Sequence, residues 1–532
     1  MFDSIRHITR LAQVARMLAQ YDALAPRELA HHIPGSVRFA GRLARAWPGQ
    51  QGSHIGRTTR PGERLGLALQ SLGPAFIKLG QFLATRPDII GIELTKDLKS
   101  LQDRLPPFPT TQTKAIIATE LERPWDELYA TLSEPMAAAS IAQVHKAETL
   151  PLDDEVGAAK TVAVKVLRPG IEENFAKDMA ALAFAAKWAE RLRPALKRLE
   201  PVKLIETLAV SSKMEMDLRL EAAAASELAE NNSGRKNFRV PEIDWTRTSQ
   251  RILTLEWIDG TPLTDGATVK AQGFDPTNIA RHVIETFLTH ALKDGFFHAD
   301  MHQGNIFIDP EGCLTAVDFG IMGRLDHDSR RYLAEILFGF LTRDYERLAE
   351  VHFTAGYVPA HHSRHDFAQS LRAVGEPIFG RHAGAISMAR LLAQLFQVTE
   401  TFDMHLQPQL VLLQKTMMVV EGVARDLDPD LNMWEVSRPV VEQWMVDNFS
   451  PQAQLREAAE SAGALGRSLK HLPAIFTAAE TLPSILTPHG LRLHPDAARA
   501  IAKATHRQRR GANTALWIGA VALAVIALSV LV

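Results

Sequence analysis

The sequence of 532 residues contains a single cysteine, Cys313. One thiol cannot form an intramolecular disulfide, so the chain suits a reducing compartment. The GxGxxG pattern of dinucleotide- and flavin-binding Rossmann folds is also missing, which argues against a redox enzyme of that class. No internal repeat is found. A hydrophobic content of 46% with 23% charged residues is typical of a globular chain.

The first 70 residues have no lysine, yet they carry ten arginines against four acids. This positive charge suits an anionic membrane surface or nucleic acid, and a solvated arginine face on ordinary helices explains it equally well. Residues Met1–Leu24 lack the continuous apolar run of a secretory signal. Their apolar side chains recur at helical spacing, which predicts an amphipathic helix that packs on the protein or lies on a membrane. Asp3 and Asp22 disfavour a transit segment, because such segments are poor in acids.

The C-terminus has what the rest of the chain lacks, an uncharged apolar run of 19 residues, Thr514–Val532. A helix of that length reaches about 28 Å, close to the ~30 Å hydrocarbon core of a bilayer, so we predict a transmembrane helix there. Arg507, Arg509 and Arg510 precede it. Positive flanks stay cytoplasmic and attract anionic lipids, so we expect a single-pass C-terminal anchor with the soluble part facing the cytoplasm. A buried core helix is the alternative.

Hydrophobic periodicity predicts an α+β protein whose strands are concentrated in one lobe. Helical patterns are found at four places: 64–86, 94–101, 171–195 and 202–231. Strand patterns are found at 137–168, on both sides of a turn-rich segment, and then at Phe238–Val240, Arg251–Trp257, Ile306–Ile308 and Leu314–Val317. The expected domains are a basic helical segment (1–63), a helical extension (64–125), a strand-rich lobe (126–262), a helical lobe (263–450), a C-terminal helical extension (451–510) and the span (514–532).

The strongest motif is His298-Ala299-Asp300-Met301-His302-Gln303-Gly304-Asn305, which Asp318-Phe319-Gly320 follows. Phosphoryl transfer needs a carboxylate to orient the acceptor and oxygen ligands for magnesium. Asp300 and Asn305 have the spacing of the kinase catalytic loop, and Asp318 opens a DFG sequence. The motif therefore predicts a bound nucleotide with Mg²⁺, with Asp300 as the catalytic residue and Asn305 and Asp318 as metal ligands.

A second motif, Val162-Ala163-Val164-Lys165, is a near match to the kinase VAIK strand, whose lysine reaches the nucleotide phosphates. Its acidic partner should come from the helix at 202–231, where Glu215, Asp217 and Glu221 are the candidates. Asp217 and Glu221 are four residues apart and share a helix face, whereas Glu215 and Asp217 point in different directions. Only part of this set can therefore meet Lys165.

Upstream of Lys165, where kinases have a glycine-rich loop, the chain has an alanine-rich one. We predict that this loop contacts ATP through Ala137, Ala138, Ala139, Ser140, Ile141, Ala142, Gln143, Val144 and His145. Alanine lacks the positive-φ freedom that lets glycine fold closely over phosphates, so we expect altered loop geometry.

Together these features resemble the UbiB family of atypical kinase-like proteins. The resemblance also rests on Lys78-Leu79-Gly80-Gln81, which looks like the family's KxGQ hallmark, and on Glu215-Met216-Asp217, which looks like its ExD signature. Residues 86–88 and 101–103 continue the KxGQ motif. The resemblance implies a protein-kinase-like two-lobed fold with a helical N-terminal extension, to which we add the C-terminal transmembrane helix.

The resemblance further implies that Glu221 pairs with Lys165, and that Lys78 and Gln81 gate the site, with Lys78 paired to Glu215 or Asp217. It implies an atypical kinase or ATPase, using ATP or ADP with Mg²⁺, that supports ubiquinone (coenzyme Q) biosynthesis at the bacterial inner membrane. The expected partners are anionic lipids, ubiquinone precursors and other enzymes of that pathway, and nucleic acid is not among them. Met301 and Gln303 replace two prolines of the family's loop, which should loosen its backbone.

Other functions stay open from the sequence. The chain could be a true kinase for a protein or a prenylated phenol, or a scaffold that nucleotide merely orders. A hydroxylase is disfavoured, because neither a flavin fingerprint nor an iron triad is found. Outside these motifs, His361, His362 and His365 form one further cluster, which we interpret as a surface patch at the start of a helix rather than a metal site.

Overall fold

The computed structural model describes residues 2–23, 60–84, 90, 92–98, 105–152, 158–192, 200–379, 394, 398–399, 401–404, 407–450, 486–487 and 490–491. These residues form two compact units. The first contains the described residues up to Ala223 together with Glu242–Trp257. The second contains Ala224–Pro241 and the residues from Ile258 onward.

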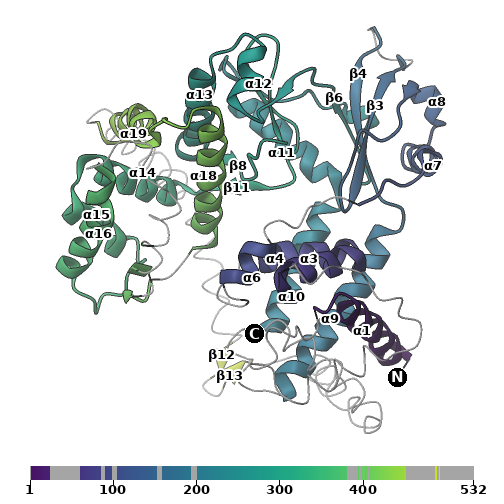
Figure 1. Ribbon diagram of the computed structural model, residues 1–532, viewed down its shortest axis with the longest axis horizontal. Coiled ribbons are helices and arrows are strands. Elements are labelled where there is room, and N and C mark those ends of the chain that lie inside the picture. Colours follow the sequence, from purple (N-terminus) through teal and green to yellow (C-terminus); the bar gives the residue numbers. More distant parts are fainter. Residues whose placement is uncertain are drawn as a thin grey trace. The chain divides into compact units, whose positions relative to one another are not determined.

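The first unit combines an antiparallel sheet with helices from the N-terminal part of the chain (Figure 1). Its helices are α1 (Phe2–Gln20), α3 (Pro61–Leu72), α4 (Pro74–Leu83), α6 (Ile92–Leu98), α7 (Thr110–Glu120), α8 (Trp125–Leu128), α9 (Ile171–Leu192), α10 (Pro201–Glu215), the start of α11 (Leu218–Asn231) and the 3₁₀ turn η3 (Trp245–Arg247). Its strands are β1 (Tyr129–Leu132), β2 (Ala137–Ala138), β3 (Ala142–Thr149), β4 (Thr161–Leu167) and β6 (Ile252–Glu256). The sheet order is β1-β3-β4-β6, and β2 pairs with β3.

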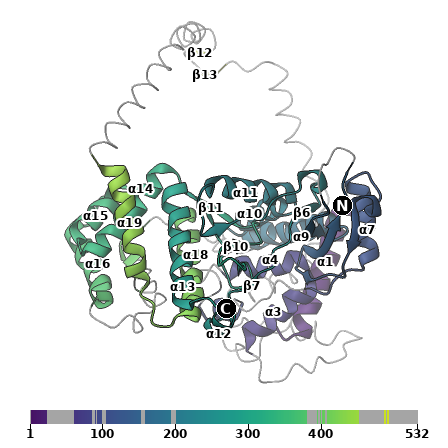
Figure 2. The same cartoon turned by 90° about the horizontal axis from the view of Figure 1, so that it is seen from above.

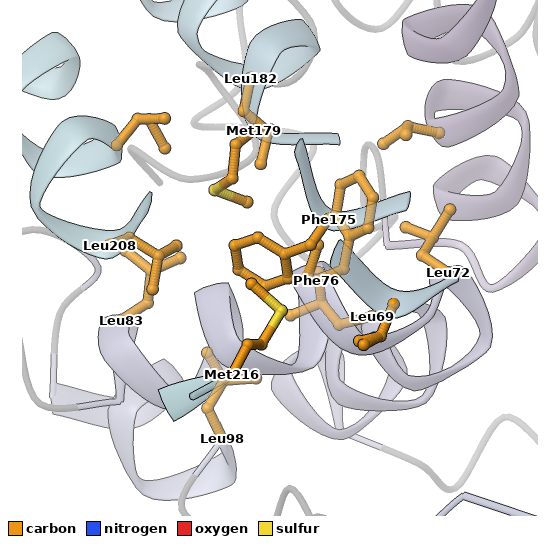
Figure 3. Close-up of a cluster of buried hydrophobic side chains, with 14 of the residues drawn as sticks. Leu69, Leu72, Phe76, Leu83, Leu98, Phe175, Met179, Leu182, Leu208 and Met216 are labelled. Atoms are coloured by element: carbon orange, nitrogen blue, oxygen red, sulfur yellow. The ribbon is translucent and has the colours of Figure 1, made fainter. Parts of the chain in front are cut away.

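The two faces of this sheet are covered differently. Val162, Val164 and Val166 alternate along β4 and pack with Phe108 and Ile117 on the side of α7 and α8. The opposite face, which includes Ala142, Leu167, Leu253 and Leu255, joins a larger cluster built from helices. Figure 3 shows the centre of that cluster, where side chains from α3, α4, α9 and α10 meet. Because successive side chains of a strand point to opposite faces, β4 contributes residues to both clusters.

Helix α1 is packed on the protein, because its apolar face contacts α9 and α3. Leu11, Val14 and Leu18 are at most 4% exposed. Arg10 adds an ion pair across this interface, with its Nε 2.5 Å from Oδ1 of Asp178. Of the two positions left open for the amphipathic segment, the structure thus has the packed one, with Leu11, Val14 and Leu18 withdrawn from solvent.

Two helices predicted as continuous are broken in the structure. The pattern at 64–86 divides into α3 and α4 at Gly73, whose φ of 107° is outside the range that other residues adopt readily. Pro74 then begins α4, since the first helical position does not need an N–H donor. The pattern at 202–231 divides into α10 and α11 around Met216. Both predictions were wrong about continuity, because amphipathic periodicity persists across a single-residue break.

The second unit contains short strands and a set of long helices (Figures 1 and 2). Its strands are β5 (Phe238–Arg239), β7 (Thr261–Pro262), β8 (Phe296–His298), β9 (Ile306–Ile308), β10 (Leu314–Ala316), β11 (Met322–Arg324), β12 (Leu486–Thr487) and β13 (Gly490–Leu491). Its helices are α12 (Gly266–Ala271), α13 (Pro276–Thr289), the π-helical turn η4 (His290–Asp294), α14 (His327–Thr342), α15 (Tyr345–Thr354), α16 (Arg364–Phe379), α18 (Pro408–Leu427) and α19 (Met433–Phe449). The predictions for 306–308 and 314–317 are confirmed, whereas β7, β8 and β11 were not predicted.

In the second unit, β8 pairs antiparallel with β11, and β9 pairs antiparallel with β10. The segment 299–305 therefore connects β8 to β9, and Asp318 to Gly320 lie between β10 and β11. Helix α13 packs against α18 and α19 beside these strands. The arrangement brings the two motif segments of this unit to neighbouring strand ends.

Among the helices of the described residues, none is both long enough and apolar enough to cross a membrane. The predicted span at 514–532 and its arginine flank lie outside those residues, as do residues 86–88 and 101–103 of the hallmark motif.

Candidate functional site

In the first unit, Lys165 on β4 forms an ion pair with Glu221 on α11. The Lys165 Nζ lies 2.7 Å from Oε1 and 2.9 Å from Oε2 of that carboxylate. The Lys165 side chain is 15% exposed and the Glu221 side chain is 7% exposed. Of the three acids that the sequence left as candidates, Glu221 is therefore the partner of the strand lysine.

The alanine-rich loop presents alternate side chains to the two faces of the sheet. Val144 lies opposite Lys165 in the β3–β4 register, and Ala142 joins the same cluster as Leu167. Gln143 and His145 point to the other face, where both are fully buried. Their side chains thus face away from Lys165, although both belong to the segment predicted to contact ATP. The strand period of two explains the difference, because neighbouring residues cannot share a face.

Gln143 and His145 instead tie β3 to the segment before α7. Gln143 Oε1 accepts from the Phe108 N–H at 3.0 Å, and Gln143 Nε2 lies 2.9 Å from both Thr113 Oγ1 and His145 Nε2. His145 Nδ1 lies 2.7 Å from the Ser133 carbonyl, which can only accept, so Nδ1 carries the proton and Nε2 accepts. Burial lowers the pKa of His145, which matches this neutral form.

Arg168 holds the alanine-rich loop in place, a role that the sequence did not reveal. Its backbone N–H donates to the Ile141 carbonyl at 2.8 Å, and its guanidinium donates to the Ala139 carbonyl at 2.8 Å. A second guanidinium nitrogen donates to the Pro106 carbonyl at 2.9 Å. These hydrogen bonds hold the backbone of the alanine-rich loop. The only signal for this role in the sequence was that an arginine follows the strand that carries Lys165.

The two acids of the ExD signature have different partners. Lys78 on α4 lies 2.6 Å from Glu215 Oε2 at the end of α10, with both side chains mostly buried. Asp217 pairs with Arg219 at 2.7 Å, and this arginine holds the pKa of the Asp217 carboxyl below its usual value. Met216, which lies between the two acids, points into the cluster of Figure 3. Glu215 and Asp217 on either side of it point to different partners. Gln81 follows Lys78 by one helical turn on α4.

In the second unit, the buried His298 joins the two motif segments. Its Nε2 donates to the carbonyl of Asp318, and its Nδ1 accepts from the Asp300 N–H at 3.1 Å. Burial lowers the pKa of His298, so the imidazole is neutral and makes both bonds at once. Phe319 packs against this ring at a centroid distance of 5.9 Å and is 1% exposed. The histidine therefore fixes the backbone of Asp300 relative to the backbone of Asp318.

The oxygen atoms predicted to bind magnesium are held in defined orientations. Asn305 Nδ2 donates to the Asp300 carbonyl at 3.1 Å, which turns the Asn305 Oδ1 away from that contact. Asp318 Oδ1 accepts from the Gly320 N–H at 3.0 Å. An amide oxygen and a carboxylate are the hard ligands that Mg²⁺ prefers, so these residues fit the metal that the motif implies. The Asp300 side chain is 29% exposed and accessible to an acceptor.

His302 is a further residue at this site that sequence reasoning left without a role. Its Nδ1 accepts from the Gly304 N–H at 3.0 Å, so its Nε2 carries the proton. That Nε2 lies 3.6 Å from Oδ2 of Asp300. The sequence shows that His302 follows Asp300 by two residues. It does not show where the His302 side chain points, because a loop has no regular period from which to predict side-chain direction.

The two departures from the family loop are compensated by contacts. Met301 is 1% exposed, and the Gln303 side-chain amide donates to Asp426 on α18. Thr416, also on α18, is buried and its hydroxyl lies 3.1 Å from the Ala299 carbonyl. Helix α18 thus anchors both ends of the loop, so the expected loosening from the missing prolines is opposed by packing and hydrogen bonds.

Comparison with known families matches both units. Residues 100–352 match the ABC1 atypical kinase-like domain, and residues 371–432 match the UbiB helical domain. The second match includes α18, the helix that anchors the loop around Asp300. The kinase-like α+β class predicted from the sequence is confirmed by the first match.

Several curated relatives carry the name "Probable protein kinase UbiB". The one from Marinobacter nauticus is 40% identical over 430 residues, which cover 80% of this chain and 76% of the relative. The one from Xanthomonas campestris is 38% identical over 491 residues, which cover 91% and 85%. A solved structure, titled as the complex of Rv3197 with erythromycin from Mycobacterium tuberculosis, matches 70% of this chain and 93% of that one at 24% identity and a TM-score of 0.48.

Proposed function

Since this chain belongs to the UbiB family of atypical kinase-like proteins, we propose that it is an Mg-ATP-dependent kinase or ATPase that supports ubiquinone (coenzyme Q) biosynthesis at a membrane. The observation that carries the nucleotide part is the buried pair of Lys165 and Glu221, 2.7 Å apart. A lysine fixed by an acid in this way presents its charge to phosphates at little further entropic cost.

The chain's own residues have separable roles in this proposal. Lys165 binds the phosphates, and Glu221 sets its position. Asn305 and Asp318 supply the oxygen ligands for magnesium, which neutralises charge on the phosphate oxygens when it is bound. Asp300 orients an attacking water or an acceptor hydroxyl, and His298 keeps the Asp300 and Asp318 backbones in register.

The membrane part of the proposal rests on the predicted span at 514–532 and on Arg507, Arg509 and Arg510. A basic flank of this kind attracts anionic lipids. We infer that ATP turnover is coupled there to the access or presentation of quinone precursors, with the C-terminus as a single-pass anchor in a bacterial inner membrane. Normal quinone levels after deletion of residues 507–532, at native expression, would contradict the membrane-coupled form.

The test is ATP turnover by the purified full chain with Mg²⁺ and vesicles containing anionic lipid. Asp300→Asn and Asp318→Asn are run beside it, because each changes one side chain from an acid to an amide of the same size. Phosphate is followed both as the free ion and as phosphate transferred to protein or to a phenolic lipid. Free phosphate that increases with lipid and is lost in both variants supports the coupled ATPase.

The same measurement separates the alternatives. Transferred phosphate that Asp300→Asn abolishes supports a true kinase, a function that the names of the relatives favour. Nucleotide binding without turnover, together with complementation of quinone synthesis by the Lys165 and Asp300 variants, would overturn the enzymatic proposal in favour of a scaffold.

A further inference from the structure

The second unit contains a cluster of potential metal ligands away from the kinase motifs. His361 and His362 lie in the turn before α16, and Asp403 lies in the turn before α18. Their nearest ligand atoms all lie within 4.8 Å of one another. The three residues include two neighbours and one residue 41 positions further on, so folding rather than sequence brings them together.

His362 is the centre of this cluster. Its Nε2 lies 3.4 Å from Oδ2 of Asp403. Although that distance is within ion-pair range, the geometry is not that of a hydrogen bond, and this buried nitrogen has no hydrogen-bond partner among the residues that the structure describes. A buried polar atom loses its hydration with no hydrogen bond to compensate, so its position opposite a carboxylate needs a reason.

The spacing fits a shared metal ion. Zinc binds imidazole nitrogen at about 2.0–2.1 Å and carboxylate oxygen at about 2.0–2.2 Å, so two ligands of a tetrahedral site lie about 3.3–3.5 Å apart. The His362–Asp403 separation of 3.4 Å equals that edge. The His361 and His362 rings are 4.1 Å apart, close enough for a small rotation of the exposed His361 to complete three ligands.

The backbone around these ligands is held by packing. Phe402, next to Asp403, is 6% exposed and packs on the rings of His362 and Phe367, at 5.4 and 5.0 Å. Asp403 itself has a φ of 48°, a left-handed conformation that costs energy for a residue other than glycine. The carboxylate is therefore directed towards the histidines by a strained turn that a buried aromatic ring anchors.

We propose that His361, His362 and Asp403 bind one divalent transition-metal ion of the zinc class, with water as the fourth ligand. Imidazole ligands select such ions over Mg²⁺ and Ca²⁺, which prefer oxygen. The ion fastens the turn before α18 to the turn between α15 and α16, and α18 carries Thr416, whose hydroxyl contacts the Ala299 carbonyl. From the sequence we interpreted the three histidines as a surface patch, because the sequence does not show that Asp403 lies beside two of them.

His365 supplies the matched control. It belongs to the same histidine cluster in the sequence, but its side chain is 80% exposed and lies 3.3 Å from Glu346. In the structure it is not one of the three ligands. Asp318→Asn is a second control, because the predicted magnesium ligands could also bind zinc.

The experiment is a Zn²⁺ titration of the full-length chain, stripped of metal and free of any histidine tag, in competition with a chromogenic chelator. We expect one tight equivalent that is retained in His365→Gln and Asp318→Asn. His362→Gln and Asp403→Asn each remove a ligand, so affinity should fall by more than the 10–100-fold that is typical for loss of an outer-shell partner. Asp403 is 72% exposed, so its variant should fold.

Co²⁺ gives a second readout that depends on geometry. A tetrahedral site of two nitrogens and oxygen gives intense visible absorption bands, which should be present in the wild type and in His365→Gln but absent in the two ligand variants. Unchanged Zn²⁺ affinity in His362→Gln and Asp403→Asn, or no tight equivalent in the wild type, would overturn the site.

Discussion

Lys165 Nζ lies almost equally far from both carboxylate oxygens of Glu221, at 2.7 and 2.9 Å. The contact joins the central strand β4 to the first turn of α11 over 56 residues of sequence. Both side chains are largely withdrawn from solvent, and each contributes to neutralising the charge of the other. Burying an unpaired charge is costly, which makes this pair sensitive to the loss of one partner.

Removal of the Lys165 charge should lower both nucleotide affinity and the free energy of unfolding, and the two effects can be measured separately. Lys165→Met removes one partner of a buried ion pair, so we expect a loss of about 3 kcal/mol in the free energy of unfolding. We also expect at least a tenfold loss of nucleotide affinity, because about 1.4 kcal/mol of phosphate contact is enough for that change. Urea denaturation and titration with a fluorescent nucleotide measure the two effects.

The double variant Lys165→Met with Glu221→Met is the control. Methionine at both positions removes the carboxylate together with the lysine, and such apolar replacements of buried pairs are often neutral or stabilising. Stability should recover while nucleotide affinity stays low. Nucleotide affinity close to that of the wild type in either variant would rule out Lys165 as a phosphate ligand.

The contact between Lys78 and Glu215 predicts a second stability effect. The two side chains are 14% and 20% exposed, so Lys78→Ala should cost about 1–3 kcal/mol of unfolding free energy by leaving a mostly buried carboxylate unpaired. Lys177→Ala is the matched control, since Lys177 pairs with Glu173 on an exposed helix face and should lose less than about 0.5 kcal/mol. Equal losses in urea denaturation for the two variants would show that the Lys78 contact is no stronger than a surface pair.

Local patterns explain which parts of this fold could be predicted. The β3 and β4 strands, Lys165 and the loop from His298 to Asn305 follow from periodicity and motif spacing within short windows. Residue pattern alone could not select the partner of Lys165, because Glu215 and Glu221 belong to two helices, α10 and α11, that the sequence pattern does not separate. The contacts of Gln143 with Phe108 and of His362 with Asp403 join residues 35 and 41 positions apart, and no pattern in one sequence reveals such pairs.

Buried neutral histidines predict how stability depends on pH. Burial lowers the pKa of His352 to about 4, because its ring is enclosed by Phe367 and Tyr357. In the unfolded chain His352 binds a proton near pH 6.5, whereas in the folded chain it stays neutral down to about pH 4. Its contribution to stability is therefore fully present above pH 6.5 and is lost as the pH falls towards 4. At pH 5 this one group should cost on the order of 2 kcal/mol.

The variant His352→Phe tests the pH effect. It keeps an aromatic ring and removes the titration, so its unfolding free energy should fall less steeply between pH 6.5 and 5 than that of the wild type. The variant also loses the hydrogen bond from Nδ1 to the Leu348 carbonyl, which lowers its unfolding free energy at every pH. The quantity to compare is therefore the slope of the unfolding free energy against pH, and not its value at pH 7.5. An unchanged slope in His352→Phe would contradict the assignment.

Support of the Asp300 loop by α18 gives the last prediction. Thr416 is fully buried, and its hydroxyl lies 3.1 Å from the Ala299 carbonyl and 2.9 Å from the Leu412 carbonyl of its own helix. One hydroxyl proton is shared between two acceptors, so Thr416→Val, which keeps the shape, should cost about 1 kcal/mol in stability. Because Ala299 precedes Asp300, the larger effect should be on ATP turnover: kcat should fall several-fold with little change in the KM for ATP, as expected when positioning rather than substrate binding is lost.

Thr342→Val controls for the generic effect of this substitution. Thr342 makes the same kind of bond to the carbonyl four residues earlier, at 2.8 Å, but on an exposed face of α14. It should leave kcat unchanged, because no loop depends on it. If Thr416→Val and Thr342→Val had the same turnover, α18 would support the fold of the second unit without positioning Asp300. A fall in kcat for Thr416→Val alone would place α18, in the part of the chain that matches the UbiB helical domain, among the elements that set the geometry of the phosphoryl-transfer loop.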